Sequence, residues 1–309
     1  MIRVAASRWL VIGAAALVVQ ACTLAGREPA AFATPTAPST VAATASPTPE
    51  PTPSPTPSPS PTPKPSPRPD PPVVADEPGA LGEQLKLAEL ALRDPSTTAE
   101  DIAWMGHLQQ LVYRKLVVRR EWAAAVIGVL PAELRAAAQA NYDAGVALRA
   151  LTAPRTDLPP WRILNPAPAD DLLRIYEDAE AEFGIPWPYL ASINLVETRM
   201  GRIRGPSTSG ALGPMQFMPA TWAAYGDGDI NSDRDSIRAA ARYLKANRGQ
   251  TDMPNALFRY NHSDLYVQAV TSYAELMRAE PALYRGYYSW QVYYLTVRGD
   301  VLLPIGYGS

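Results

Sequence analysis

Glu197 is the strongest candidate for acid–base chemistry in this sequence. It ends an apolar stretch that includes Ile193 and Val196, and a glycine-rich loop follows it. A carboxyl group beside an apolar helix face loses water, which disfavours its charged form and raises its pKa. A carboxylic acid that is still protonated near neutral pH can donate a proton to a leaving oxygen. The alternative is an ordinary solvated glutamate on a helix surface.

The loop after Glu197 suits a ligand with polar edges and apolar faces, such as a sugar. Gln216 stands between Met215 and Phe217, so an amide donor and acceptor lie beside apolar surface. The loop also contains four glycines, which let the backbone approach a ligand closely: Gly201, Gly205, Gly210 and Gly213. The alternative is a plain surface loop whose large apolar residues belong to the core.

Histidine chemistry has little support. The only two histidines, His107 and His262, are far apart in the sequence, so a histidine zinc site or a catalytic triad is hard to assemble. Beside the second histidine, Ser263 or Asp264 is expected to cap a helix. The net charge is −2 and no basic stripe is present, which argues against a nucleic-acid partner.

The segment DGDINSDRD raises the question of a calcium site. Four of its residues match the first alternating ligand positions of an EF-hand loop: Asp227, Asp229, Asn231 and Asp233. The match fails at the sixth position, where Ser232 replaces Gly, and at the twelfth, where Arg238 replaces a bidentate Glu. We expect no cofactor, and a turn whose last aspartate caps a helix starting near Ser236. A structural calcium ion at 227–233 is the alternative.

The elements that position these residues are expected to be mainly helical. Apolar spacing and helix-start signals, including a capping box at Thr98 and Asp101, predict helices at 83–94, 98–120, 131–151, 170–183, 236–247 and 265–278, and one after Pro188 that carries Glu197. Gly184 is placed to end one of them. Near the end of the chain, β-branched and aromatic residues around Arg298-Gly299-Asp300 predict a short hairpin.

The first 22 residues have the features of an export signal. Arg3 and Arg8 precede an apolar run of eleven residues at 9–19, shorter than the roughly 20 residues that span a bilayer. The run ends in VQAC, which resembles the lipobox of bacterial lipoproteins, in which the cysteine is lipidated and becomes the new N-terminus. Gln20 departs from the small residue usual there. The alternatives to lipidation of Cys22 are an ordinary cleaved signal and an uncleaved anchor.

A proline-rich stretch from Thr34 to Pro72 predicts an extended tether, because proline removes backbone donors. In polyproline geometry, at about 3.1 Å per residue, it holds the rest of the chain on the order of 100 Å from its anchor. A glycosylated stalk is the alternative. We therefore expect an exported protein at the outer face of the cytoplasmic membrane or in the cell wall, lipid-anchored at Cys22.

Three blocks of the chain occur in the order seen in a known family. They are VETRMG with Glu197, GALGPMQFMPATW with Gln216, and ALFRYNHSDLYV with Tyr260 and Asn261, and DSIRAAARYL fits between the last two. This stretch, from about 170 to 279, resembles the catalytic domain of lytic transglycosylases, the lysozyme-like enzymes that cleave bacterial peptidoglycan. It is most similar to the membrane-bound murein transglycosylase B-like branch of actinobacterial exported proteins.

The sequence departs from that family at three positions. Thr198 stands where the family often has Ser, and Pro214 stands where it often has Leu. Thr keeps the hydroxyl and Pro214 touches only the loop, so neither change is expected to affect the chemistry. Arg259 stands where Ala often precedes Tyr-Asn, which can alter how substrate is held.

The resemblance implies a mechanism with one carboxylate. Glu197 protonates the glycosidic oxygen between N-acetylmuramic acid and N-acetylglucosamine, then accepts the proton of the muramic 6-hydroxyl as that oxygen closes on C1. The product is a 1,6-anhydro sugar. Most glycosidases use two carboxylates, whereas in this family the acetamido group and hydroxyl of the substrate replace the second.

The resemblance also implies roles for neighbouring residues. Gln216 hydrogen-bonds substrate near the cleaved bond, Tyr260 lies close to Glu197, and Asn261 helps to shape the site. Met215 and Thr198 are further substrate-binding candidates. Four aromatic residues of the tail are candidates for extending a glycan groove or, more simply, for packing of the hairpin: Tyr287, Tyr288, Trp290 and Tyr294.

Two other functions compete with this hypothesis. In a lysozyme-type hydrolase, water attacks C1 and a second carboxylate lies across the cleft, with Asp227, Asp229 and Asp264 as candidates. A non-catalytic lipoprotein that only binds the cell wall is the other alternative. Peptidoglycan glycan strands are the expected partner in all three cases, and we expect a monomer.

The predicted fold is mainly α: a lysozyme-like α-helical catalytic domain with an N-terminal helical region and a short C-terminal β hairpin. Five parts follow along the chain: a lipoprotein-type signal peptide at 1–22, a disordered Pro/Thr/Ser-rich linker at 23–79, the helical region at 80–160, the catalytic domain at 161–280 and a Tyr-rich extension at 281–309.

Overall fold

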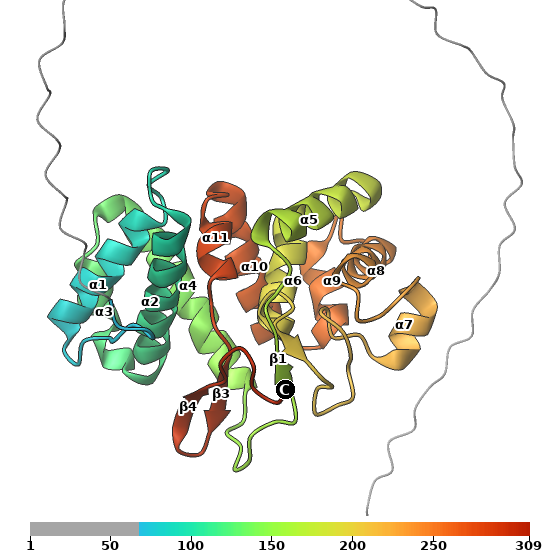
Figure 1. The fold of residues 1–309 in the computed structure, drawn as a ribbon. Coiled ribbons are helices and arrows are strands. Elements are labelled where there is room, and N and C mark those ends of the chain that lie inside the picture. The colour runs from blue at the N-terminus through green and yellow to red at the C-terminus, as the bar shows by residue number, and fades with distance from the viewer. Residues whose placement is uncertain (1–67) are drawn as a thin grey trace, which may run out of the picture. The chain divides into compact units, whose positions relative to one another are not determined.

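A computed structural model describes residues 68–309, and helices make up most of this part of the chain (Figure 1). The helices are α1 (Pro78–Ala91), α2 (Ala99–Val118), η1 (Arg120–Trp122), α3 (Ala123–Gly128), α4 (Ala132–Leu151), α5 (Ala169–Phe183), α6 (Trp187–Thr198), α7 (Pro219–Tyr225), α8 (Asp233–Ala246), α9 (Met253–Asn261), α10 (Asp264–Ala279) and α11 (Leu283–Tyr288). The strands are β1 (Arg162–Ile163), β2 (Ile203–Arg204), β3 (Tyr293–Thr296) and β4 (Gly299–Leu302). The predicted mainly α fold with a small C-terminal hairpin is confirmed.

Local sequence signals set several helix ends. The side chain of Thr98 accepts a hydrogen bond from the backbone N–H of Asp101 at 3.1 Å and so caps α2, as predicted. Helix α5 ends at Gly184, which has a left-handed φ of 70° that favours glycine. The start of α8 differs from the prediction. It begins at Asp233, because Ser232, not an aspartate, caps it by accepting from Asp235 N.

The C-terminal segment forms the predicted hairpin and a second contact that the sequence did not suggest. Strands β3 and β4 pair antiparallel, with Tyr293 opposite Leu302. Strand β1 pairs with β2, and the end of the chain joins them, since Ile163 N donates to Tyr307 O at 2.9 Å. The segment after α4 also bonds β3, because Arg155 N donates to Leu295 O at 3.1 Å. The tail is therefore attached to the segment that precedes α5.

One hydrophobic core runs through the N-terminal helices and the later ones. Helix α4 packs on α10, α10 packs on α6, and α5 packs on α8. Figure 1 shows α1–α4 gathered on one side of α10 and α11, and α5–α9 on the other. Between the two groups, the buried Tyr287 donates to Asn141 Oδ1 at 2.7 Å, and its ring meets Trp290 edge-on. The helical region of 80–160 is thus packed against the region of 161–280.

Residues 68–77, which are part of the predicted linker, lie against α2. Trp104 Nε1 donates to Pro69 O at 3.0 Å, and Lys115 Nζ donates to Ala75 O at 2.7 Å. Proline lacks a donor but its carbonyl still accepts, so a proline-rich strand can be held in this way. The predicted signal peptide, Cys22 and the predicted linker up to residue 67 lie outside the described residues. Among the described helices, none has the length and apolar character needed to cross a bilayer.

Candidate active site

Glu197 lies near the C-terminal end of α6, a helix in which eight of twelve residues are buried and none is exposed. The helix ends in a run of left-handed residues: Arg199 has a φ of 54°, Met200 of 60° and Gly201 of 79°. Such conformations cost energy for residues other than glycine and persist only where surrounding contacts hold them. This tight turn fixes the end of α6 and therefore fixes Glu197.

Thr198 is one of those contacts. Its side chain is fully buried, donates to Pro214 O at 2.6 Å and accepts from Gly201 N at 3.1 Å. It therefore joins the end of α6 to the loop that carries Gln216. The structure places this hydroxyl in the framework of the site, away from the position where a substrate could reach it.

The Glu197 carboxyl group is shielded from water. Burial raises its pKa to about 7, although a hydrogen bond from Tyr266 Oη to Glu197 Oε1 at 2.8 Å acts in the opposite direction. No other carboxylate of residues 68–309 contributes to this shift. Near neutral pH a substantial fraction of Glu197 is therefore protonated and able to act as an acid.

Two tyrosines lie next to the carboxyl group of Glu197. The rings of Tyr260 and Tyr266 are stacked, with 6.4 Å between centroids and 6° between planes. Tyr260 Oη donates to Met215 O at 2.7 Å, and the ring of Phe217 meets the Tyr260 ring at 5.8 Å. The stack therefore couples the second and third sequence blocks to Glu197. Tyr266 makes the direct contact, and Tyr260 supports it.

Gln216 sits at a strained point of the loop. Its φ is 52°, and its Nε2 donates to Gly213 O at 2.9 Å. Gly213 itself has a φ of 75°, and a Cβ there would lie 2.0 Å from Ile230 O, so only glycine fits. The Gln216 side chain is half-buried, which leaves part of it open to a ligand.

The remaining predicted residues do not gather around Glu197. Asn261 is exposed at the end of α9. The Met215 side chain is fully buried and touches Asn194 Nδ2 through its sulfur at 3.3 Å, so only its carbonyl serves the site. Among the tail aromatics, Tyr287 and Trp290 are buried, as packing residues are.

The 227–235 loop, considered above as a calcium site, is held by contacts among its own residues and with Arg204. Asp233 pairs with Arg204 at 3.3 Å, and Asp235 accepts from Asp229 N at 3.0 Å. Asn231 N donates to Asp229 Oδ1 at 2.9 Å. Within residues 68–309 no three His, Cys, Asp or Glu side chains are grouped as a metal site requires.

Tyr266 is the residue that sequence reasoning missed. It lies within the block ALFRYNHSDLYV, in the first turn of α10, six residues after Tyr260. Helix α10 packs on α6, so an aromatic side chain at its start faces the Glu197 end of α6. The predicted helix start at 264–265 placed Tyr266 near the beginning of a helix. It did not indicate that this helix packs against the one carrying Glu197.

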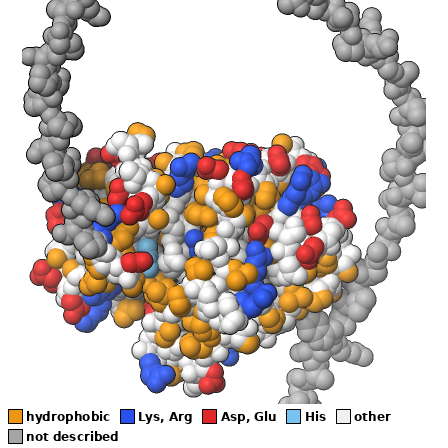
Figure 2. Space-filling model, in the orientation of Figure 1, with side chains coloured by type: hydrophobic (Ala, Val, Ile, Leu, Met, Phe, Trp, Pro, Cys, Tyr) orange, Lys and Arg blue, Asp and Glu red, His pale blue; other side chains and the backbone are white. Residues whose placement is uncertain are grey.

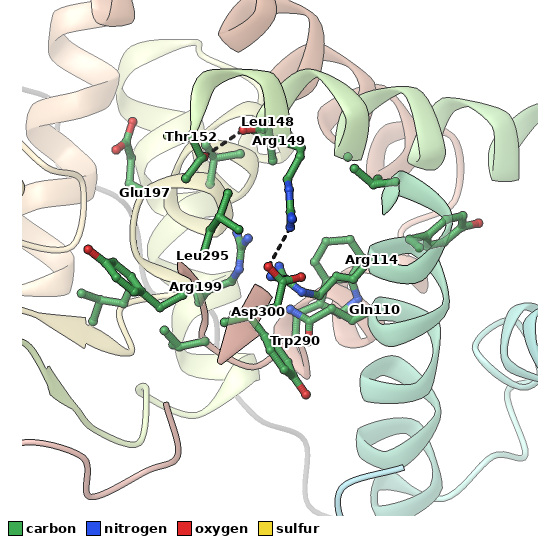
Figure 3. A pocket seen from close by; sticks show the side chains of 18 of the residues that line it. Gln110, Arg114, Leu148, Arg149, Thr152, Glu197, Arg199, Trp290, Leu295 and Asp300 are labelled. Atoms are coloured by element: carbon green, nitrogen blue, oxygen red, sulfur yellow. Dashed lines mark hydrogen bonds and ion pairs between the residues drawn. The ribbon is translucent and has the colours of Figure 1, made fainter. Parts of the chain in front are cut away.

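A cavity of about 250 Å³ adjoins Glu197 on the side of the N-terminal helices. Figure 3 shows Glu197 at one edge, with side chains of α2, α4 and the C-terminal hairpin opposite. Tyr294 and Trp290 are among its lining residues. On the face drawn in Figure 2, basic and acidic side chains are interspersed around hydrophobic and uncharged ones.

The fold and the site define a lysozyme-like α-helical domain with one shielded, protonatable glutamate. Comparison with family models is consistent with this, because residues 174–277 match the Transglycosylase SLT domain. In the same comparisons no curated protein and no solved structure matches the chain. The match supports a peptidoglycan-acting function of the lytic transglycosylase or lysozyme-like kind, with peptidoglycan as the substrate.

Removing the Tyr266 hydroxyl is expected to raise the pKa of Glu197 further. The hydroxyl stabilises the ionised carboxylate, so Tyr266→Phe favours the protonated form. If the protonated form is the active one, kcat/KM falls as pH rises through this pKa, and the fall should move to higher pH in the variant. A pH–rate profile checks this. An unchanged or lowered pKa would show that the hydroxyl does not act on Glu197.

Proposed function

We propose that this protein is a lytic transglycosylase that cleaves the β-1,4 bond between N-acetylmuramic acid and N-acetylglucosamine in peptidoglycan. Glu197 first donates its proton to the glycosidic oxygen. As a carboxylate, it then accepts the proton of the muramic 6-hydroxyl while that oxygen bonds to C1, which leaves a 1,6-anhydromuramic end. The proton that Glu197 gives is thus regained, and no water is consumed.

The observation that carries the proposal is the isolation of Glu197. Its pKa of about 7 comes from burial, not from a neighbouring carboxylate. An acid with this pKa is suited to giving and taking a proton in turn near neutral pH. A single group with both roles is what the formation of an anhydro product requires.

The neighbouring residues receive proposed roles that follow their positions. Gln216, half-buried on its strained turn, hydrogen-bonds the sugar near the cleaved bond. Tyr260 and Tyr266 orient Glu197. Asn261 contributes only at the outer rim, because it is exposed. Met215 and Thr198 act through the framework of the site, since their side chains are fully buried.

The nearest competing function is a lysozyme-type hydrolase, which needs a second carboxylate to activate water. Asp300 is the other carboxylate among the residues lining the cavity beside Glu197. Its two carboxylate oxygens are paired with Arg114 and Arg149, each at 2.7 Å, so both are already engaged by guanidinium groups. This arrangement favours the transglycosylase over the hydrolase.

Mass analysis of the fragments released from purified peptidoglycan tests the proposal. Anhydro-muropeptides are the expected products. Reducing ends would overturn the transglycosylase in favour of the hydrolase. Binding to peptidoglycan with no release would instead indicate a cell-wall-binding protein.

We also propose that the protein is monomeric and belongs to the membrane-bound murein transglycosylase B-like branch. It is exported, and a lipid on Cys22 holds it at the outer face of the cytoplasmic membrane or in the cell wall. The apolar run followed by VQAC supports this placement. A Cys22→Ala variant should then lose its membrane attachment, as fractionation of cells would measure. Retention of the variant in the membrane would contradict lipid anchoring.

A further inference from the structure

The cavity beside Glu197 is built largely by parts of the chain outside the family match at 174–277. Its walls come from α2, α4, the end of α6 and the C-terminal hairpin. Glu197 and Arg199 contribute from the α6 side, and Figure 3 shows Arg149 of α4 reaching to Asp300 of β4. The cavity is therefore an addition by this chain to the domain that carries Glu197.

Positive charge exceeds negative charge in this cavity. Arg114, Arg149 and Arg199 line it, and Asp300 pairs with the first two. Arg199 has no carboxylate within ion-pair distance among the described residues, and its Nη1 donates only to the carbonyl of Leu195. Arg199 is thus left without an ion-pair partner among residues 68–309.

Arg199 is costly to keep in this position. Burial lowers the pKa of its guanidinium to about 10, and the nearby Arg114 and Arg202 act in the same direction. The left-handed turn at the end of α6 holds its backbone in place. A cation that is partly removed from water is normally paired, so a carboxylate entering the cavity would supply the partner that the described chain lacks.

A second atom of the cavity also lacks a partner. Arg114 Nε is buried and has no hydrogen-bond acceptor in the described chain, although the guanidinium lies over the Tyr293 ring at 4.6 Å. Arginine presents its donors as a planar fork that matches a carboxylate. Apolar and aromatic side chains line the same cavity, among them Trp161, Val292, Tyr294 and Leu295.

We propose that this cavity binds a carboxylate carried by the substituent of the muramic acid residue that Glu197 processes. The proposal rests on the proposed function, since it takes the strand cut at Glu197 as the ligand. N-acetylglucosamine has no carboxylate, whereas the lactyl group of muramic acid has one, either free or amide-linked to a peptide with its own carboxylates. Because Glu197 is part of the wall, a substituent of a sugar bound there can enter the cavity.

Three glycan substrates distinguish the sources of the carboxylate. Peptide-free strands offer the free lactyl carboxylate, peptide-bearing strands offer only peptide carboxylates, and strands whose carboxylates are converted to methylamides offer neither. Binding is measured by calorimetry in a Glu197→Gln background, and KM is measured with Glu197 present. Loss of a charge-assisted hydrogen bond corresponds to roughly a tenfold change in affinity. We expect the carboxylate-bearing strands to bind about tenfold more tightly than the amidated ones.

The charge of Arg199 is tested directly. Arg199→Gln should remove most of the preference for carboxylates. Arg149→Gln, at a half-buried arginine of α4 that lines the same cavity, should reduce it without altering α6. Arg174→Gln is the matched control, because Arg174 is an exposed arginine of α5 paired with Asp171 and lies outside the cavity. Thermal unfolding establishes that each variant is folded.

The outcomes separate this proposal from the proposed function. A preference for peptide-free or peptide-bearing strands that disappears in Arg199→Gln supports the cavity and identifies the source. Cleavage of all three substrates with equal KM, unaffected by both arginine variants, would overturn the cavity alone. Carboxylate-dependent binding without any cleavage by the parent would overturn the transglycosylase and retain the cavity, and loss of both signals would overturn both.

Discussion

Replacing Glu197 by Gln is expected to reduce glycan cleavage by on the order of 10³-fold, because one side chain supplies both the acid and the base in the proposed mechanism. Gln keeps the size of the side chain and can still contact Tyr266, but its amide acts as neither an acid nor a base near neutral pH. Among residues 68–309, no second carboxylate shifts the pKa of Glu197. Release of anhydro-muropeptides from purified peptidoglycan, followed over time, measures the loss.

The control for this variant is its stability. A buried carboxylate with a raised pKa favours the folded state in its protonated form, so its contribution declines as pH rises through about 7. Gln carries no charge at any pH, so Glu197→Gln should unfold at the same temperature as the parent, or a higher one, at pH 8. Substantial cleavage by a folded Gln variant would remove Glu197 from the mechanism.

Replacing Glu89 by Ala is expected to lower the free energy of unfolding by about 3–5 kcal/mol, the range for breaking a buried ion pair from one side. Glu89 in α1 is 1% exposed, and it accepts from Arg93 as well as from Gln109 Nε2 at 3.0 Å and Tyr113 Oη at 2.6 Å. Arg93 also pairs with Glu280 after α10. Loss of Glu89 therefore leaves buried donors in α2 without an acceptor.

Chemical denaturation of the parent and the variant measures this effect. Glu83→Ala is the matched control, since Glu83 lies in the same helix, is 61% exposed and pairs only with Lys86. Exposed pairs contribute roughly 0–1 kcal/mol, so the control should lie within that range of the parent. Equal losses for the two variants would show that the buried network contributes no more than a surface pair.

Much of the fold could be predicted because helix boundaries are encoded locally. Thr98 with Asp101 and Phe183-Gly184 each specify a helix end within a few residues of sequence. The packing of α4 on α10 could not be predicted in this way, because it depends on faces more than a hundred residues apart. Neither could the β1–β2 pair, where two residues on each strand are too few for an alternating pattern.

In the candidate site, too, the features encoded locally could be predicted, and those that depend on tertiary packing could not. Glu197 was identified by the apolar residues of its own helix, and its burial follows from them. Met215 was expected to contact substrate because a buried and a ligand-facing methionine have the same local sequence. Arg114 and Arg149 each occur in ordinary helical sequence, and only the tertiary fold brings both to Asp300.

The packing of α4 on α10 has a practical consequence for anyone who shortens this chain. A fragment cut to the matched segment, 174–277, would keep Tyr273 but lose the rings of Tyr287 and Trp290, which meet it at 5.3 and 5.6 Å. The α10 surface that α4 covers would then face water, and large apolar patches of this kind promote aggregation. The family match marks only part of the folded unit, and the smallest piece worth expressing extends from Arg68, which pairs with Asp101, to Tyr307, which bonds β1.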